Sequence, residues 1–376
     1  MRIVMIGQKG LPARSGGIER HVEDLALRLV REGHEVIAYC RSSYVGDRGT
    51  QKYYEGVHCI TVPTICSKHF ETVIQTFFAS IHALFMHADI IHYHGIGPSL
   101  FAWIPRLLAP RSRVIATFHC QDYFHQKWGW LARCVFRLGE VVCCTLPHRT
   151  IAVSQTIQTY IKKTYGRDAV YLPNAVVLPS HEKSDTHVRQ FGLSKNNYIL
   201  LVSRLVRHKN IHFVIKGYQV MQRRGSVLPK LAIVGSACHT DDYEAELKAL
   251  SAGDPNILFL GEQTGEPLAQ LYCNARLFVH ASQSEGLSYA ILEAMSYGCP
   301  VLVSDIAENV EILHAVGTTF AANNIKDFIF KLNALLVSEG APIASAQTYK
   351  SVIERFYNSE TVFSQTLALY RQFKEC

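Results

Sequence analysis

The sequence predicts an α/β protein made of two doubly wound, Rossmann-like halves that face each other across a cleft. The chain has 376 residues and is 48% hydrophobic, which is more than one typical core accommodates, so two domains are expected. Short β-rich runs alternate with helical stretches from end to end, as in parallel sheets with crossover helices. The segment Leu172–Ala175 and the polar stretch Pro179–Thr186 lie between two such series, which places the domains at 1–174 and 175–360.

The first half carries six predicted strands, over 2–6, 35–40, 58–62, 89–92, 113–118 and 149–153. Its first helix, over 17–32, has one apolar stripe from Ile18 to Leu29 and ends at Gly33. A second helix, over 72–87, is the most apolar of the chain but contains two histidines and stops before Asp89. We therefore expect a buried helix and not a membrane span.

The second half carries five predicted strands, over 198–202, 231–234, 257–260, 277–280 and 300–304. A helix over 289–297 has Ile291, Ala294 and Met295 on its apolar side and ends before Gly298. In doubly wound folds, ligands bind beyond the carboxyl ends of the strands, so two facing sheets would place the site in the cleft.

The charge of the chain is unevenly distributed. Residues 1–180 contain 20 Lys+Arg and 12 Asp+Glu, a net charge of +8, and the remainder contains 18 and 19, a net charge of −1. A solvated basic face and attraction to an anionic partner both explain this excess. No nucleic-acid motif is visible, so an anionic membrane surface is the preferred partner.

Eleven cysteines without repeating spacing, and no signal peptide, indicate a reducing cytoplasm.

Glu285 and Glu293 are separated by seven residues at the start of the helix over 289–297. Glu285 is expected in the loop before the helix, and Glu293 about one turn inside it. The backbone N–H groups of Gly286, Leu287 and Ser288 lie between them, where a helix N-terminus favours an anion. Such a site suits a nucleoside-diphosphate sugar, with a phosphate on the backbone and hydroxyl groups on the two carboxylates. Two exposed glutamates on a surface helix would have the same spacing.

Arg204 and Lys209 follow the first predicted strand of the second half, in the run Ser203–Asn210. A forked guanidinium and a point-charge ammonium at a strand's carboxyl end suit a diphosphate leaving group without a metal. A solvated basic turn is the alternative.

The loop Gly7–Gly17 opens the first helix but does not match a dinucleotide fingerprint, so Gly16 and Gly17 are interpreted as a mobile lid over a sugar or phosphate.

Histidines end two predicted strands of the first half. His119 follows the strand over 113–118 and is a candidate for positioning a reacting sugar, although a structural role is common for histidine. His92 and His94 lie close together but have no carboxylate or cysteine at ligand spacing, and the chain has no D-x-D motif, so no metal site is expected. The segment Phe124–Gly139 combines tryptophans with arginines, which suits either a membrane-interface helix or an ordinary packed helix.

Together, the basic pair, E-x7-E, the Gly-Gly loop and the strand-end histidine resemble the retaining family-4 glycosyltransferases of GT-B fold. The resemblance covers essentially the whole chain. The runs at 7–17, 94–98 and 127–129 are similar to a bacterial subgroup of rhamnosyl- and mannosyltransferases of surface polysaccharide assembly. The sequence departs from the family at Asn174-Ala175, where Asn-Gly is usual, and at Cys120–Asp122, which leaves the acceptor open.

The resemblance also implies roles for individual residues. Arg204 and Lys209 would hold the diphosphate, Glu293 the ribose and Glu285 the donor-sugar hydroxyls. His119 would lie beside the transferred sugar, so that His119, Glu285, Arg204 and Lys209 form the catalytic set. The family sends its final helix, here within 361–376, back onto the N-terminal, acceptor-side domain, and 175–360 would bind the donor. The acceptor-side residues are expected to be Arg14, His94, Asp122 and Trp128.

We therefore expect a metal-independent, cofactor-free hexosyltransferase at the inner face of the cytoplasmic membrane. It would move a hexose or deoxyhexose, with retention, from a nucleoside-diphosphate sugar to a saccharide or lipid-linked saccharide in bacterial polysaccharide assembly. The main alternative is a non-hydrolysing nucleotide-sugar epimerase of the same architecture, which needs no acceptor. A catalytically silent binding subunit is a third possibility, against which the complete Arg204, Lys209, Glu285 and Glu293 set argues.

Overall fold

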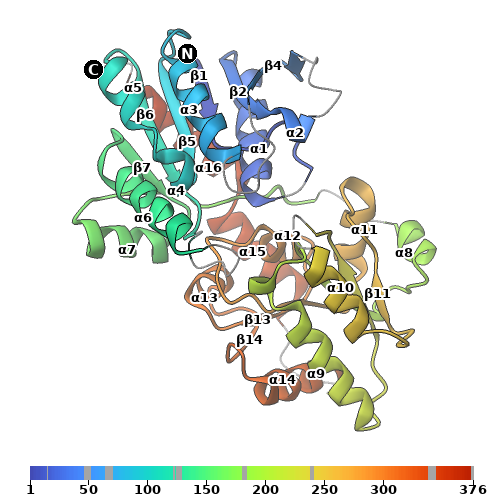
Figure 1. Ribbon diagram of the computed structural model, residues 1–376. Coiled ribbons are helices and arrows are strands. Elements are labelled where there is room, and N and C mark those ends of the chain that lie inside the picture. Colours follow the sequence, from blue (N-terminus) through green and yellow to red (C-terminus); the bar gives the residue numbers. More distant parts are fainter. Residues whose placement is uncertain are drawn as a thin grey trace. The chain divides into compact units, whose positions relative to one another are not determined.

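A computed structural model describes residues 1–14, 16–45, 52–63, 71–121, 123, 129–179, 184–237, 241–337 and 344–373. The chain divides into two compact units (Figure 1). Unit 1 comprises Met1–Asn174 and Glu360–Cys376, and unit 2 comprises Ala175–Ser359. None of the described helices has the length and hydrophobicity needed to cross a bilayer.

Unit 1 is built on a sheet whose strands, among the described residues, follow the order β3-β4-β2-β1-β5-β6-β7-β8. All neighbours pair in parallel except β3 and β4. The strands are β1 (Arg2–Ile6), β2 (Glu35–Arg41), β3 (Tyr53–Tyr54), β4 (Val57–Val62), β5 (Ile90–His94), β6 (Arg113–Phe118), β7 (Arg149–Ala152) and β8 (Val170–Tyr171). Because β1 lies between β2 and β5, the chain changes direction across the sheet at β1, and ligands of doubly wound folds bind at this point.

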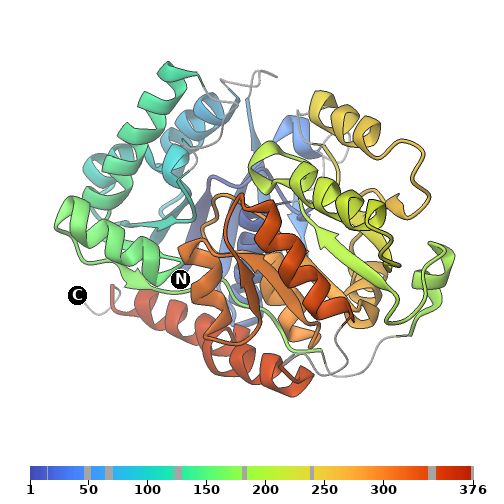
Figure 2. The same ribbon diagram turned by 90° about the horizontal axis from the view of Figure 1, so that it is seen from below.

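Helices lie on both faces of this sheet (Figures 1 and 2). They are α1 (Gly17–Arg31), α2 (Ser42–Val45), α3 (Glu71–Ala83), α4 (Ile96–Ser99), α5 (Trp103–Leu108), α6 (Trp130–Thr145), α7 (Gln155–Tyr165) and α16 (Ser359–Arg371). Alternation along β5 separates the faces: Tyr93 bonds Ser80 of α3, and His92 bonds Tyr370 of α16. The side chains of His92 and His94 therefore point to the face that α1 and α16 cover.

Helix α16 belongs to the core of unit 1 although it follows unit 2 in the chain. Leu367, Leu369 and Tyr370 are buried in one hydrophobic cluster with residues of β1 and α1. The Tyr370 hydroxyl lies 2.6 Å from Nδ1 of His92, and the Glu360 carboxylate pairs with Arg28 of α1. The last helix thus supports the strand that ends at His94.

Unit 2 contains a parallel sheet of order β11-β10-β9-β12-β13-β14. Its strands are β9 (Tyr198–Val202), β10 (Lys230–Val234), β11 (Ile257–Phe259), β12 (Leu277–His280), β13 (Val301–Ser304) and β14 (Thr318–Phe320). Its helices are α8 (Thr186–Gln190), η3 (Arg207–Lys209), α9 (Ile211–Arg223), α10 (Asp241–Leu250), α11 (Gly265–Asn274), α12 (Tyr289–Ser296), α13 (Ala307–Leu313), α14 (Ile325–Val337) and α15 (Ala346–Phe356).

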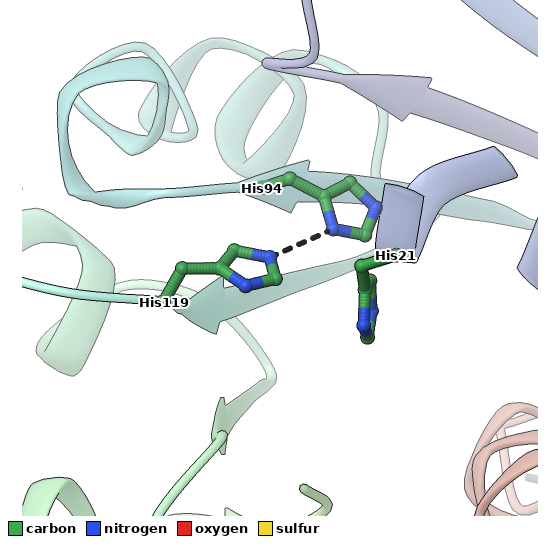
Figure 3. A group of neighbouring side chains, drawn as sticks. All are labelled: His21, His94 and His119. Carbon is green, nitrogen blue, oxygen red and sulfur yellow. Dashed lines mark hydrogen bonds between the residues drawn. The ribbon is translucent and has the colours of Figure 1, made fainter. Parts of the chain in front are cut away.

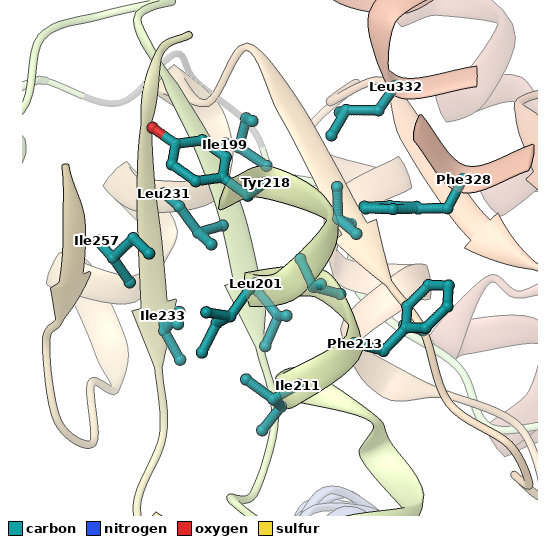
Figure 4. Close-up of a cluster of buried hydrophobic side chains, with 14 of the residues drawn as sticks. Ile199, Leu201, Ile211, Phe213, Tyr218, Leu231, Ile233, Ile257, Phe328 and Leu332 are labelled. Carbon is teal, nitrogen blue, oxygen red and sulfur yellow. The ribbon is translucent and has the colours of Figure 1, made fainter. Parts of the chain in front are cut away.

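The core of unit 2 lies between its sheet and helices α9 and α14. Figure 4 shows Leu201 of β9 and Ile233 of β10 facing Ile211 and Phe213 of α9, with Phe328 of α14 beside them. The apolar runs in β9 and β10 are buried on both faces of the sheet, as expected for central parallel strands. The predicted fold class, two doubly wound α/β halves, is confirmed for the described residues.

Candidate functional site

The strand order of unit 2 brings Lys209 and Glu285 together. Strands β9 and β12 are neighbours in the sheet, and the chain leaves them toward opposite sides, so their carboxyl ends flank the switch point. Lys209 lies in η3, directly after β9, and Glu285 lies in the loop after β12. The Nζ atom of Lys209 is 2.5 Å from Oε1 of Glu285, and both side chains are largely buried, with 14% and 10% of their surface exposed.

His280, the last residue of β12, holds Glu285 from the other side. Its Nε2 lies 2.8 Å from Oε1 of Glu285 and 2.9 Å from the Ser282 hydroxyl. Burial lowers the pKa of His280, although Glu285 opposes that effect, so the ring is neutral and can donate from Nε2. Burial raises the pKa of Glu285, but the Lys209 ammonium and the His280 hydrogen bond outweigh burial and hold that pKa well below its usual range.

Arg204 is the second cation at this end of β9. Its side chain is half-buried, and within the described part of the chain no carboxylate pairs with its guanidinium. Arg207, three residues later, is engaged elsewhere: it is 2.5 Å from Glu246 and lies over the ring of Tyr243. The contacts of Arg204 therefore differ from those of the neighbouring Arg207, and the role of Arg204 stays a prediction.

Helix α12 begins at Tyr289, as predicted, and ends at Ser296. Gly286, Leu287 and Ser288 are buried directly before it, and Ser288 is its N-cap residue. The Ser288 hydroxyl lies 3.4 Å from Nε2 of His280, which ties the helix N-terminus to the Lys209–Glu285 pair. Glu293 is half-buried inside the helix.

Three polar residues that sequence reasoning missed connect the loops after β9 and β12. Asn210 adopts a left-handed conformation with φ 58° and donates from Nδ2 to Oδ1 of Asn323, at 3.1 Å. Gln283 donates to the same Asn323 oxygen at 2.9 Å. His280 was also missed, although its position at the carboxyl end of a predicted strand is the feature that singled out His119.

A second cluster lies at the carboxyl edge of the sheet in unit 1. His94 ends β5, His119 directly follows β6, and His21 lies on α1 (Figure 3). Nδ1 of His94 is 3.3 Å from Nε2 of His119, and one nitrogen from each of the three rings lies within 4.8 Å of the others. From the sequence, His119 was a candidate for positioning the sugar and His94 a separate acceptor-side candidate. His21 was missed, although it falls three residues after Ile18, on the buried side of α1.

The electrostatics of this cluster favour neutral imidazoles. Burial lowers the pKa of His21 to about 4, despite the opposing charge of Asp24. Burial, reinforced by the neighbouring histidines, holds the pKa of His94 and of His119 well below the usual value. Each ring is therefore neutral at neutral pH and carries its proton on one nitrogen and a lone pair on the other.

The remaining predicted residues lie apart from these contacts or outside the described residues. Gly16, with φ 107°, is the N-cap of α1, which begins at Gly17, and a side chain at Gly16 would collide with the Glu19 carboxylate. Arg14 is exposed, and its guanidinium lies 5.4 Å from the centre of the Tyr44 ring. Asp122 and Trp128 lie outside the described residues.

Helix α6 differs from the helix expected within Phe124–Gly139. It begins at Trp130 and continues to Thr145, and the segment 124–128 lies outside the described residues. Gly139 does not end the helix, because its missing side chain lets α6 approach the backbone of Ile96 in α4. The outer side of α6 is apolar and exposed, with 77% of Trp130 and 63% of Leu131 accessible.

Two family models match the chain, one in each unit. "Glycosyltransferase Family 4" matches residues 15–178, and "Glycosyl transferases group 1" matches residues 183–355. The chain therefore belongs to the glycosyltransferases that combine these two domains. Solved structures give the same fold: a sucrose-phosphate synthase from Thermosynechococcus elongatus superposes with a TM-score of 0.83 over 100% of this chain and 99% of that chain, at 18% identity. The fold is GT-B.

The individual relatives either have low sequence identity to this chain or match over only part of their length. The O-antigen chain mannosyltransferase RfbU of Salmonella typhimurium is 34% identical over 202 residues, 53% of this chain and 52% of that protein. An uncharacterized glycosyltransferase of Methanocaldococcus jannaschii is 23% identical over 99% of this chain and 98% of its own. The structure of Anabaena HepE in complex with UDP and glucose has a TM-score of 0.78 at 19% identity and covers 99% of this chain and 100% of that chain.

Proposed function

We propose that the protein transfers a hexose or deoxyhexose from a nucleoside-diphosphate sugar, with retention and without a metal, to a saccharide or lipid-linked saccharide in bacterial polysaccharide assembly. The observation that carries this proposal is the Lys209–Glu285 pair at the switch point of unit 2, with Arg204 in the same loop after β9. The similarity to RfbU, and to an Escherichia coli galactosyltransferase named for an acceptor on diphosphoundecaprenol, supports the acceptor class. HepE, of the same fold, binds UDP and glucose.

The charges in unit 2 suit a departing diphosphate. A half-buried guanidinium and a largely buried ammonium at one strand end would stabilise negative charge as the sugar–phosphate bond breaks, and such electrostatic stabilisation is usually the largest catalytic contribution. Glu285 stays ionised beside Lys209, so it can accept hydrogen bonds from sugar hydroxyls. The buried backbone of Gly286–Ser288 at the N-terminus of α12 would contact the phosphate, and Glu293 the ribose.

We assign the supporting roles in unit 1 from the family resemblance. His119 would contact the transferred sugar as a neutral hydrogen-bonding group, and Gly16 and Gly17 would let backbone approach the donor. Arg14, His94, Asp122 and Trp128 remain proposals for the acceptor side. Retention is checked directly by the anomeric configuration of the product in an NMR spectrum.

An anionic membrane surface is the proposed location of transfer, at the inner face of the cytoplasmic membrane. Much of the exposed apolar surface of unit 1 lies on neighbouring helices: α5 exposes Leu107 and Leu108, and α6 exposes Trp130, Leu131 and Leu138. The Arg106 guanidinium donates to the Leu146 carbonyl, which joins α5 to the end of α6. Exposed Arg133 and Arg137 accompany these side chains on α6, the combination that suits a lipid interface.

The test is donor binding together with an acceptor requirement. Thermal unfolding of the full chain with UDP-, GDP- and dTDP-sugars should reveal one nucleotide that stabilises the protein, since a donor far above its Kd adds about 3 kcal/mol. Release of nucleoside diphosphate should then depend on an added saccharide or lipid-linked saccharide. Conversion of the nucleotide sugar to its epimer without acceptor would support the epimerase alternative, which the two family models do not favour.

A further inference from the structure

We propose that His21, His94 and His119 form a binding site for one divalent transition-metal ion, zinc being the best fit, in addition to the sugar-transfer function. Three imidazoles from three separate elements lie together at one edge of the sheet, and His94 and His119 are turned toward each other (Figure 3). His94 is fully buried and His119 is 6% exposed, whereas His21 on α1 is half-buried and provides the accessible side.

The spacing of the nitrogens is the first argument. A tetrahedral zinc ion with Zn–N bonds of about 2.0–2.1 Å has its ligand nitrogens about 3.4 Å apart. Nδ1 of His94 and Nε2 of His119 already lie 3.3 Å apart. One nitrogen from each of the three rings lies within 4.8 Å of the others, so the third nitrogen is close to the distance that a tetrahedral ion needs.

The tautomer of His94 is compatible with this geometry. A metal at Nδ1 requires the neutral ring that carries its proton on Nε2. Nε2 of His94 is buried and has no hydrogen-bond partner, so no donor there opposes this tautomer.

The surroundings select these three histidines and exclude a fourth. Both nitrogens of His92 are occupied, Nδ1 by the Tyr370 hydroxyl at 2.6 Å and Nε2 by the Thr117 hydroxyl at 2.7 Å. His92 packs on His94, with ring centres 4.0 Å apart, and helps to fix its orientation. Three protein nitrogens leave the fourth position of a tetrahedral ion to water or to a substrate oxygen.

The class of metal follows from the ligands. Neutral imidazole suits zinc, copper, nickel and cobalt(II), whereas magnesium and calcium prefer oxygen ligands.

The test uses full-length protein without a polyhistidine tag, first freed of metal by chelation. Cobalt(II) titration should give the visible absorption of a tetrahedral site at one equivalent, and one equivalent of zinc should displace it, with calorimetry giving the affinity. His21→Ala and His119→Ala should each weaken zinc binding by at least about tenfold. His212→Ala, which removes a half-buried histidine in unit 2, is the matched control and should bind as the wild type does.

Circular dichroism and thermal unfolding without metal verify that each variant is folded. His94 is left unchanged, because its full burial makes a folding defect the expected result of substitution. Wild-type protein that shows no tetrahedral cobalt spectrum, or folded His21 and His119 variants that bind zinc as the wild type does, would overturn the proposal. The binding measurements contain no sugar substrate, so they stand or fall independently of the transferase assignment.

Discussion

The carboxylate of Glu285 is shared by two partners: the ammonium of Lys209, 2.5 Å away, and the Nε2 atom of His280, 2.8 Å away. From the sequence, Lys209 is predicted to bind the diphosphate and Glu285 to bind the sugar, as two independent contacts. In the structure they form one electrostatic unit, so a substitution of either residue changes the charge state or the freedom of the other.

The first prediction concerns this pair. Lys209→Met should lower the free energy of unfolding at neutral pH by roughly 3–5 kcal/mol, since it leaves a largely buried carboxylate without its cation. In the wild type, the lowered pKa of Glu285 contributes stability that is present above the ordinary carboxyl pKa, about 4.3, and is lost as pH falls through the folded pKa. Urea unfolding across pH 3–8 should therefore show that the difference between variant and wild type shrinks in acid.

A double variant is the control for the pair. Lys209→Met combined with Glu285→Gln removes both charges and should recover most of the lost stability at neutral pH. A double variant as unstable as Lys209→Met would contradict the assignment of the loss to an unpaired carboxylate.

The second prediction isolates the diphosphate cation. Arg204→Ala should reduce donor affinity or turnover by roughly 10²-fold or more, the effect of losing one charged transition-state contact. Its melting temperature should stay near that of the wild type, because within the described residues no carboxylate pairs with this guanidinium. Arg207→Ala is the matched control: this arginine pairs with Glu246, and kinetics should be nearly unaffected. Equal losses in both variants would argue against a specific role for Arg204.

The third prediction is that transfer survives chelation. Arg204 and Lys209 supply the positive charge that a metal would otherwise bring to a diphosphate, so excess EDTA should leave initial rates unchanged. Complete loss of turnover that added metal restores would show that the charge stabilisation has been misplaced.

The fourth prediction concerns the membrane. The protein should sediment with anionic vesicles at low salt and be released as salt rises. Replacing Arg133 and Arg137 with Gln should lower partitioning roughly 30-fold, at about 1 kcal/mol for each basic residue. Replacing Arg223 and Arg224, two exposed arginines of unit 2, should have little effect. Equal partitioning of the wild type onto neutral and anionic vesicles would count against the proposed surface.

Apolar runs bounded by turn residues predicted every long strand of both sheets, with strand ends within about two residues of those observed. The strands that were missed give weak patterns: Tyr53–Tyr54 and Val170–Tyr171 have two residues each, and Thr318–Phe320 begins with two threonines. The helix expected within Phe124–Gly139 extends past Gly139 in the structure. The tertiary role of Gly139, close approach to Ile96, leaves no local trace in the sequence.

Local sequence patterns carry no information on which of the candidate site residues contact one another. Arg204, Lys209 and Glu285 are candidates because each follows a recognisable strand or precedes a recognisable helix. Their proximity depends on β9 lying next to β12, and the order of parallel strands is not encoded in local patterns. The histidine cluster was missed for the same reason, since it needs α1 to cover the face of β5 to which His94 points.

The last prediction separates the two glutamates. A carboxylate that accepts hydroxyl hydrogen bonds contributes about 1.5–3 kcal/mol for each charged bond. Glu293→Gln should therefore weaken both the donor and the bare nucleoside diphosphate, if Glu293 holds the ribose. Glu285→Gln should depress transfer while leaving the bare nucleotide bound as tightly as before or more tightly, because Lys209 loses the anion that competes with the diphosphate. Calorimetry with the nucleoside diphosphate and each variant decides between them: equal weakening in both would refute this division of roles.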